Sequence, residues 1–261
     1  MSPTFLLRHV SLVTRSLARI LPFYRDTLGL VARQPDARTL ALHFSATGPA
    51  VITFTEEPAA VEPRERVAGL FHIALLVPDR PTLAAVLARL VEYHQPIEGL
   101  SDHGVSEAIY LSDPDGNGLE IYRDRPRADW PMAGERVAMF TRALDARGLL
   151  RDLPSPPPTA PLAHATLGHL HLQVTALPAA REFYTGKLGL KVRQDDYPGA
   201  LFMAADGYHH HVAVNTWGRP APRGGAATTG LTGFAAATAR ASAPSTLADP
   251  DGIRVTLEPL A

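Results

Sequence analysis

The sequence predicts an α+β fold built from four βαβββ units, the fourth of which is degenerate. The first observation behind this prediction is an internal repeat, because residues 9–30 align on residues 169–190 without a gap. The second is that both copies pass from strand-like alternation of apolar residues into a helix-length stretch. The third is an Asp-Pro-Asp-Gly turn, at residues 113–116 and 249–252, which precedes a last apolar run in two further units.

The first and third units share one order of elements. After the opening strand, a helix is predicted to end at the motif Phe-Tyr-x-x-x-Leu-Gly-Leu, which covers residues 23–30 and 183–190. The glycine of this motif, Gly29 or Gly189, is typical of the residue that ends a helix in the left-handed conformation. The strands that follow are expected at residues 40–44 and 51–55 in the first unit, and at 200–204 and 211–215 in the third.

The second unit covers residues 70–122, and its last strand is predicted at 118–122. The fourth unit is shorter and runs from about residue 229 to residue 258, with its last strand at 253–257. We expect it to be degenerate, because residues 235–248 leave little room for the helix of the other units.

A connector divides the predicted chain into two regions. Residues 5–125 hold the first and second units, and residues 166–261 hold the third and fourth. The connector, residues 126–165, contains a predicted helix near 139–150 and a proline-rich stretch at 154–158. Because proline-rich segments are semi-rigid spacers, this stretch is expected to link the two regions.

The composition excludes several kinds of partner. The formal charge of -1, from 25 basic and 26 acidic residues, favours neither nucleic acid nor an anionic membrane. We therefore expect a small-molecule partner; the composition is also compatible with a homo-oligomer. The sequence shows no transmembrane segment and no secretory signal, so a cytoplasmic protein is expected. Because the chain has no cysteine, histidines and carboxylates remain as metal ligands.

The second unit places a histidine and a glutamate on the same side of its sheet. In its first strand, Ile73 and Leu75 belong to the apolar face, so that His72 points to the opposite face. In its last strand, Ile121 belongs to the apolar face and Glu120 points away from it. Alternation therefore predicts that His72 and Glu120 are a candidate pair of metal ligands.

The layout of the units and the motif at residues 23–30 and 183–190 resemble the vicinal oxygen chelate superfamily. This family includes glyoxalase I, bleomycin-resistance proteins and extradiol ring-cleaving dioxygenases. The resemblance implies two curved, eight-stranded cups, each formed by a pair of βαβββ units. It also implies metal ligands that point inward from the first and last strands of a unit, which are the positions of His72 and Glu120.

The segment from residue 103 to residue 122 resembles the extradiol dioxygenases more specifically. It contains His103-Gly104, then Tyr110, the Asp-Pro-Asp-Gly turn and finally Glu120. The resemblance implies that His103 and Tyr110 form hydrogen bonds to the substrate or to an intermediate. These two residues stand a few positions closer together than in several such enzymes.

The third unit contains more histidines than packing requires. Alternation predicts that His169 and His171 point into the cup from its first strand, and that His209 and His211 do so from its last. The same alternation predicts that His210 points away from the cup. The resemblance implies that His169 is a metal ligand and that His211 is the acid-base group, with His171 as its neighbour.

The pairing of units decides the third metal ligand. Pairing the second unit with the third gathers His72, Glu120 and His169 in one cup, and this is the arrangement that we expect. Pairing the first with the second would instead make His9 the third ligand. The remaining strands of the first and fourth units carry no comparable residues, so these two units are expected to be structural.

Two histidines and one carboxylate suit Fe(II), with Mn(II) as the alternative ion. The resemblance therefore implies an extradiol, catechol 2,3-dioxygenase-like enzyme that inserts O₂ into a small aromatic diol. A glyoxalase-type metal-dependent isomerase is the alternative enzyme, although it would use a second carboxylate ligand. A metal-free drug- or metabolite-binding protein of the bleomycin-resistance kind is the alternative without catalysis.

Overall fold

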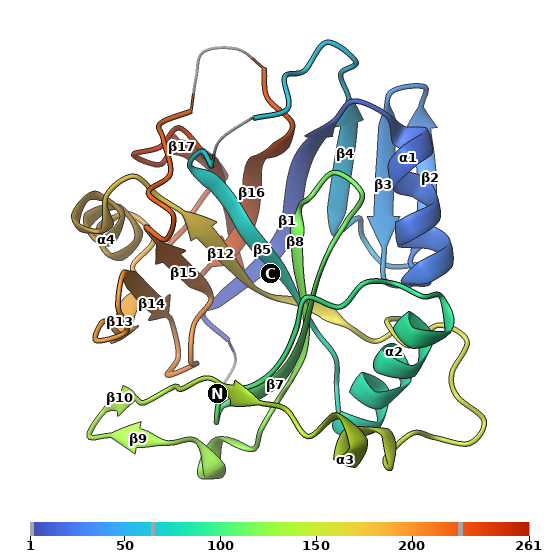
Figure 1. Cartoon of the computed structure of the whole chain (residues 1–261). Coiled ribbons are helices and arrows are strands. Elements are labelled where there is room, and N and C mark those ends of the chain that lie inside the picture. The colour runs from blue at the N-terminus through green and yellow to red at the C-terminus, as the bar shows by residue number, and fades with distance from the viewer. Residues whose placement is uncertain (1–2, 64–65, 224–226, 261) are drawn as a thin grey trace.

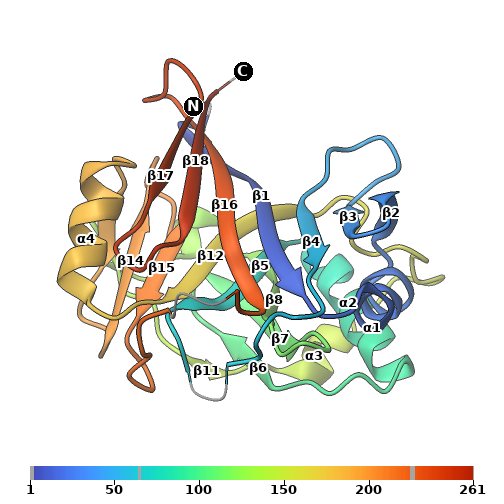
Figure 2. The same ribbon diagram turned by 90° about the horizontal axis from the view of Figure 1, so that it is seen from above.

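The computed structural model describes residues 3–63, 66–223 and 227–260. Two mixed β-sheets form the body of the molecule, with the helices packed on their outer sides (Figures 1 and 2). In sheet order, the seven-stranded sheet comprises β17 (Ser245–Ala248), β18 (Arg254–Pro259), β16 (Gly230–Thr238), β1 (Phe5–Thr14), β4 (Ile52–Glu56), β3 (Thr39–His43) and β2 (Val31–Asp36).

The nine-stranded sheet carries the candidate site. In sheet order it comprises β11 (Arg142–Ala143), β6 (Gly99–Asp102), β7 (Ser106–Ser112), β8 (Gly118–Asp124), β5 (Gly69–Leu76), β12 (Thr166–Gln173), β15 (Val212–Asn215), β14 (Ala200–Ala204) and β13 (Lys191–Gln194). A separate short ribbon is formed by β9 (Met132–Ala133) and β10 (Arg136–Val137).

The sheet topology pairs the second unit with the third. Strands β5 and β12, the first strands of these units, run antiparallel at the centre of the nine-stranded sheet. Strands β1 and β16 join the first and fourth units in the same antiparallel way. In Figure 2, β1 runs beside β16 and β5 runs beside β12. Each sheet therefore takes strands from both sides of the connector.

The expectation of eight strands from each pair of units holds for the second and third units, which contribute four strands each, and is wrong for the first and fourth, which together contribute seven. The fourth unit supplies only β16, β17 and β18, and its described residues contain no helix. The connector adds β11 to the other sheet, where it pairs with β6. The α+β class and the degeneracy of the fourth unit agree with the sequence prediction.

The helices cover the apolar faces of the sheets. They are α1 (Leu17–Pro22), which continues as a π-helical turn (Phe23–Thr27), α2 (Arg80–Glu92), a 3₁₀ turn (Arg127–Asp129), α3 (Ala146–Leu150) and α4 (Leu177–Gly186). Gly29 follows the π-helical turn and Gly189 follows α4. Their φ angles are +75° and +73°, as predicted from the repeated motif. No helix of the described ranges is long and apolar enough to cross a membrane.

The helix predicted near residues 139–150 is shorter than expected. Residues 142 and 143 are strand β11, and Asp145 then caps α3 by accepting a hydrogen bond from the Gly148 amide. Pairing with β6 therefore takes precedence over helix formation in the first part of this segment.

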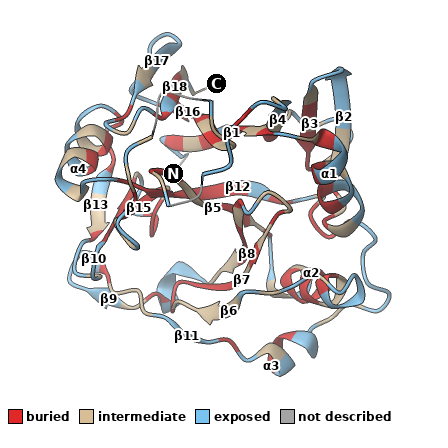
Figure 3. Ribbon diagram, turned by 45° about the horizontal axis from the view of Figure 1, so that its top comes forward, coloured by how far each residue is buried: buried red, intermediate tan, exposed pale blue. Residues whose placement is uncertain are grey.

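One continuous apolar cluster ties both sheets to the helices. Its buried members include Val10 on β1, Ile20 on α1, Leu87 on α2 and Leu172 on β12. Figure 3 shows that the strands in the middle of the molecule are largely buried, whereas the outer helix faces and loops are exposed. The nine-stranded sheet is therefore held on a rigid support, and the side chains on its inner face have defined positions.

Two hydrogen bonds connect the repeated motifs of consecutive units. The tyrosine of the first helix motif, Tyr24, donates to Asp113 in the turn of the second unit at 2.9 Å. In the same way, Tyr184 of the third unit donates to Asp249 of the fourth at 2.8 Å. The two sequence motifs thus meet between units that belong to different sheets.

Candidate metal centre and adjoining pocket

The three candidate ligands lie on three neighbouring strands. His72 is on β5, Glu120 on β8 and His169 on β12, and all three are buried. The Nε2 atoms of His72 and His169 each lie 3.0 Å from Glu120 Oε2. All three ligand atoms lie within 4.8 Å of one another, so that one ion can contact them together.

The electrostatic surroundings favour the protonation states that a metal ion requires. Burial alone would raise the pKa of Glu120, but the adjacent His169 and His72 outweigh it and hold this pKa well below its usual range. Burial lowers the pKa of His169 to about 4, against the opposing effect of Glu120. Near neutral pH the site therefore contains a carboxylate and a neutral imidazole, the forms in which these side chains bind metals.

One buried nitrogen supports a metal at this position. His72 Nε2 is sealed from solvent and has no hydrogen bond of acceptable geometry among the described residues, although it faces Glu120. An unpaired buried polar atom is costly, and coordination of an ion would compensate for it. Two imidazoles and one carboxylate also match the donor set of non-haem Fe(II) sites. The residues present therefore fit such an ion.

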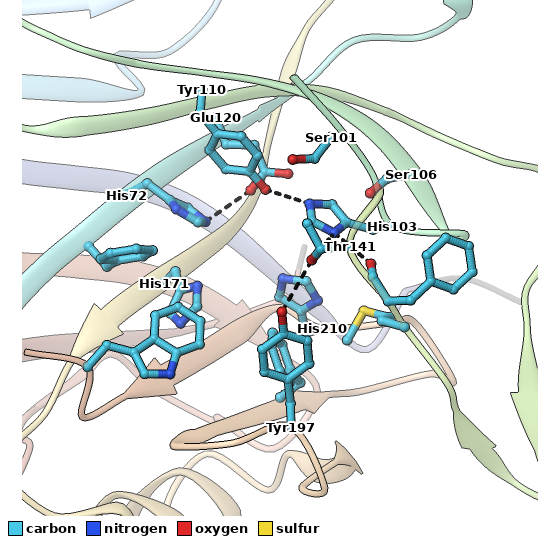
Figure 4. Close-up of a pocket in the computed structure, with 15 residues that line it drawn as sticks. His72, Ser101, His103, Ser106, Tyr110, Glu120, Thr141, His171, Tyr197 and His210 are labelled. Atoms are coloured by element: carbon cyan, nitrogen blue, oxygen red, sulfur yellow. Dashed lines mark hydrogen bonds and ion pairs between the residues drawn. The ribbon is translucent and has the colours of Figure 1, made fainter. Parts of the chain in front are cut away.

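A cavity of about 310 Å³ opens beside His72 and Glu120 (Figure 4). Much of its wall is aromatic and comes from both units of the sheet: Phe71, Tyr110, Phe140, Tyr197, Phe202 and Trp217. Its polar lining includes several histidines, and Ser101, Ser106 and Thr141 lie on one side of it. Such a cavity suits a small, flat, largely apolar molecule.

His103 and Tyr110 form a hydrogen-bonded pair on the wall of this cavity. His103 Nδ1 lies 2.9 Å from the carbonyl oxygen of Phe140, which can only accept, so Nδ1 carries the hydrogen. His103 Nε2 then accepts a hydrogen bond of 2.8 Å from the Tyr110 hydroxyl. Burial, together with nearby Glu120, raises the pKa of Tyr110 well above its usual range, so the phenol stays protonated.

His171 also lines the cavity, on the strand that carries His169. The side-chain amide of Asn215 donates a hydrogen bond of 3.0 Å to His171 Nε2. Burial lowers the pKa of His171 well below its usual range, with smaller contributions from neighbouring histidines. His171 is therefore a neutral imidazole that contacts the space beside the candidate ligands.

The expected orientation of the three consecutive histidines is wrong. His210 lines the cavity, whereas His211 lies outside it, against Phe5 and in a separate surface pocket. His209 is completely buried behind the cavity wall. The prediction extended strand alternation through these residues, but β15 begins only at residue 212, and residues 205–211 form a turn. In a turn, side chains do not alternate between two faces.

His9 lies apart from the other candidate ligands, in the seven-stranded sheet. Its Nε2 lies 2.7 Å from the Thr53 hydroxyl on the neighbouring strand β4. Burial lowers the pKa of His9, and Glu258 opposes this effect. The structure therefore brings His169, and not His9, to His72 and Glu120.

Several pocket residues gave no signal in the sequence. Phe71 lines the cavity although it precedes His72 directly, because it is an extra residue in the β5–β12 ladder: Leu70 pairs with Leu172 and His72 with His171. Such a β-bulge turns a side chain toward the face from which alternation excludes it. Tyr197 and Trp217 lie in loops, where no periodicity identifies them.

Comparison with known proteins agrees with this picture. Residues 6–121 and 166–243 match the family described as the glyoxalase/bleomycin resistance protein/dioxygenase superfamily. A catechol-2,3-dioxygenase of Bacillus subtilis (strain 168) is 44% identical over 220 residues, which are 82% of this chain and 76% of that protein.

Two solved structures have a similar fold at low sequence identity. A putative dioxygenase from Bacillus subtilis subsp. subtilis str. 168 has a TM-score of 0.60 at 15% identity and covers 98% of this chain and 86% of its own. Glyoxalase I from Zea mays has a TM-score of 0.57 at 15% identity, covering 98% of this chain and 92% of its own. At such identities the likeness shows the fold alone.

Proposed function

Since the chain belongs to the glyoxalase/bleomycin resistance protein/dioxygenase superfamily, we propose that it is an extradiol dioxygenase that inserts O₂ into a small catechol-type diol. The observation that carries the proposal is the buried cluster of His72, Glu120 and His169 beside an aromatic-walled cavity. The homologous catechol-2,3-dioxygenase supports the same reaction class.

The three clustered residues would hold Fe(II), with Mn(II) as the alternative ion. When bound, the ion would supply Lewis acidity toward the diol oxygens and one-electron chemistry toward O₂. The three residues would hold it from the protein side, and the cavity beside them would leave room for the substrate. The aromatic side chains Phe71, Trp217 and Tyr197 would hold the ring by stacking and exclude water.

His210 takes the acid-base role in this proposal, in place of His211. It lines the cavity, and its Nδ1 is already hydrogen-bonded to His209. Its Nε2 is therefore the ring nitrogen that can accept a proton from a diol hydroxyl and return it to a reacting oxygen. His211 lies outside the cavity and cannot reach the substrate.

Tyr110 and His103 would orient the substrate from the opposite unit. The Tyr110 oxygen can accept a hydrogen bond from a diol hydroxyl while Tyr110 itself donates to His103. When negative charge develops on a nearby oxygen, the same hydroxyl can turn and donate to it. His171, held by Asn215, completes the polar lining between the aromatic residues and the ligands.

The isomerase alternative is less well supported. It would use a second carboxylate ligand, whereas the candidate cluster found among the described residues contains one carboxylate, Glu120. The likeness to glyoxalase I concerns the fold.

The proposal is tested by anaerobic loading with Fe(II), followed by O₂ uptake and by absorbance of the yellow ring-fission product across a panel of catechols. We expect about one iron per chain and turnover of catechol. Retained metal with conversion of a glutathione hemithioacetal, and no O₂ uptake, would favour the isomerase. Absence of both metal and turnover would favour a binding protein.

A further inference from the structure

The turn between β14 and β15 carries two histidines that are hydrogen-bonded to each other inside the protein. Nδ1 of His209 lies 2.8 Å from Nδ1 of His210. On the other side of the ring, His209 Nε2 lies 2.9 Å from Oδ1 of Asp124, at the end of β8. His209 is completely buried, and His210 lines the cavity. A continuous chain thus leads from a carboxylate to the cavity wall.

These hydrogen bonds determine which nitrogen of each ring carries a hydrogen. The Asp124 carboxylate can only accept, so that a neutral His209 carries its hydrogen on Nε2 and its Nδ1 is an acceptor. His210 must then donate from its own Nδ1. In a neutral imidazole only one nitrogen carries hydrogen, so Nε2 of His210 keeps a free electron pair.

Surrounding contacts hold the chain in place. The Tyr208 hydroxyl donates to the second oxygen of Asp124 at 2.9 Å, and Tyr122 in turn lies 2.8 Å from the Tyr208 hydroxyl. Both carboxylate oxygens therefore have partners. The ring of His210 packs against the candidate ligand His169 and against Phe202, with centroids 4.1 and 5.1 Å apart, which restricts its rotation.

We propose that Asp124 and His209 are positioning residues that hold His210 in the tautomer whose Nε2 can accept a proton in the cavity. The inference rests on the proposed function, because that function assigns proton transfer to His210. A carboxylate that orients an imidazole through its far nitrogen is the same physical arrangement as in the Ser-His-Asp triad. Here a second histidine extends the arrangement by one ring.

The direct test is the tautomer of His210 in the full-length protein. Two-bond ¹H–¹⁵N spectra of histidine-labelled protein, loaded with diamagnetic Zn(II), distinguish a protonated Nδ1 from a protonated Nε2. The signal is assigned with a His210→Gln variant. We expect hydrogen on Nδ1 of His210 in the unmodified protein, and hydrogen on Nε2 would overturn the inference whatever the activity.

The functional test is Asp124→Asn. His209 and Tyr208 contact different oxygens of Asp124, and in the amide one of these two atoms becomes an NH2 group that can only donate, so that the two partners compete for one oxygen. We expect the Nδ1–H form of His210 to decrease and kcat with catechol to fall about 100-fold. Because the ligands and the aromatic wall are intact, iron content is expected to stay the same and KM to change less than about threefold.

Two further variants separate positioning from general damage. Asp124→Glu keeps an acceptor and should restore at least part of kcat and of the Nδ1–H signal. Asp206→Asn makes the same chemical change at an exposed position of the turn that carries His209 and His210, and it should alter neither kcat nor the Nδ1–H signal. Unchanged kcat in Asp124→Asn despite an altered tautomer would overturn the positioning role. If the unmodified protein does not consume O₂ with catechols, the proposed function fails, and the spectrum alone decides the tautomer.

Discussion

Glu120 supplies the single negative charge among the three candidate metal ligands. Replacing it by Gln removes that charge and leaves two neutral imidazoles, so we expect iron per chain to fall more than tenfold. Tyr110→Phe removes only a hydrogen-bonding hydroxyl, so iron should be retained while kcat falls roughly 10- to 1000-fold. Iron content after gel filtration and catechol turnover measure both effects. Equal loss of iron in the two variants would show that the roles are assigned incorrectly.

The two equivalent histidines of the first and third units provide a matched pair of substitutions. His169 lies 3.0 Å from Glu120, whereas His9 is hydrogen-bonded to Thr53 in the other sheet. We expect His169→Ala to lose iron and His9→Ala to keep it, as measured by metal content of the folded proteins. Loss of iron in His9→Ala alone would move the third ligand to His9.

At the scale of the element, β-bulges bring the site together. Gly168 is an extra residue in β12, because Leu167 pairs with Leu75 and His169 with Ala74. A Cβ at Gly168 would overlap the hydroxyl of Tyr122 on β8. The absent side chain therefore lets Tyr122 reach across the sheet to Tyr208, beside the candidate ligand His169.

Gly168→Ala is expected to lower the free energy of unfolding by about 1–3 kcal/mol, because the added methyl group must displace a buried ring. Urea unfolding followed by circular dichroism measures the change. Gly186→Ala is the control, since a Cβ at this last residue of α4 meets no atom within 4 Å. A loss of the same size in both variants would contradict the explanation by overlap.

At the scale of the whole molecule, the bonds from Tyr24 to Asp113 and from Tyr184 to Asp249 join units of different sheets. Burial raises the pKa of Asp113 above its ordinary 3.8, although Asn117 and Tyr24 donate hydrogen bonds to it and oppose this shift. The native state therefore binds a proton more readily than the unfolded chain. The stabilisation that comes from protonated Asp113 is present below pH 3.8 and is lost as the pH rises through its elevated pKa.

This linkage predicts how an Asp113→Asn variant compares with the unmodified protein. The free energy of unfolding of the unmodified protein, relative to the variant, should decrease as the pH rises from below 3.8 to above the elevated pKa. Urea unfolding of both proteins at a series of pH values gives this difference. An increase with pH over the same range would mean that hydrogen bonding, and not burial, dominates the pKa of Asp113.

The sequence by itself determined the repeated units, the degenerate fourth unit and the positions of His72 and Glu120. Local periodicity suffices for these features, because alternation along a regular strand states which side chains share a face. The glycines that follow the helices of the first and third units, Gly29 and Gly189, were predictable for the same reason, since a left-handed residue is a local requirement.

Only the tertiary structure decided which histidines meet. The pairing of β5 with β12 joins segments about 95 residues apart and brings His169 to Glu120. Two irregularities break the alternation on which the sequence prediction relied. The bulge at Phe71 turns that side chain into the cavity, and because residues 205–211 form a turn, His210 lines the cavity in place of His211. Asp124 carries no local signal at all, because its hydrogen bond to His209 exists only after the second and third units have formed one sheet.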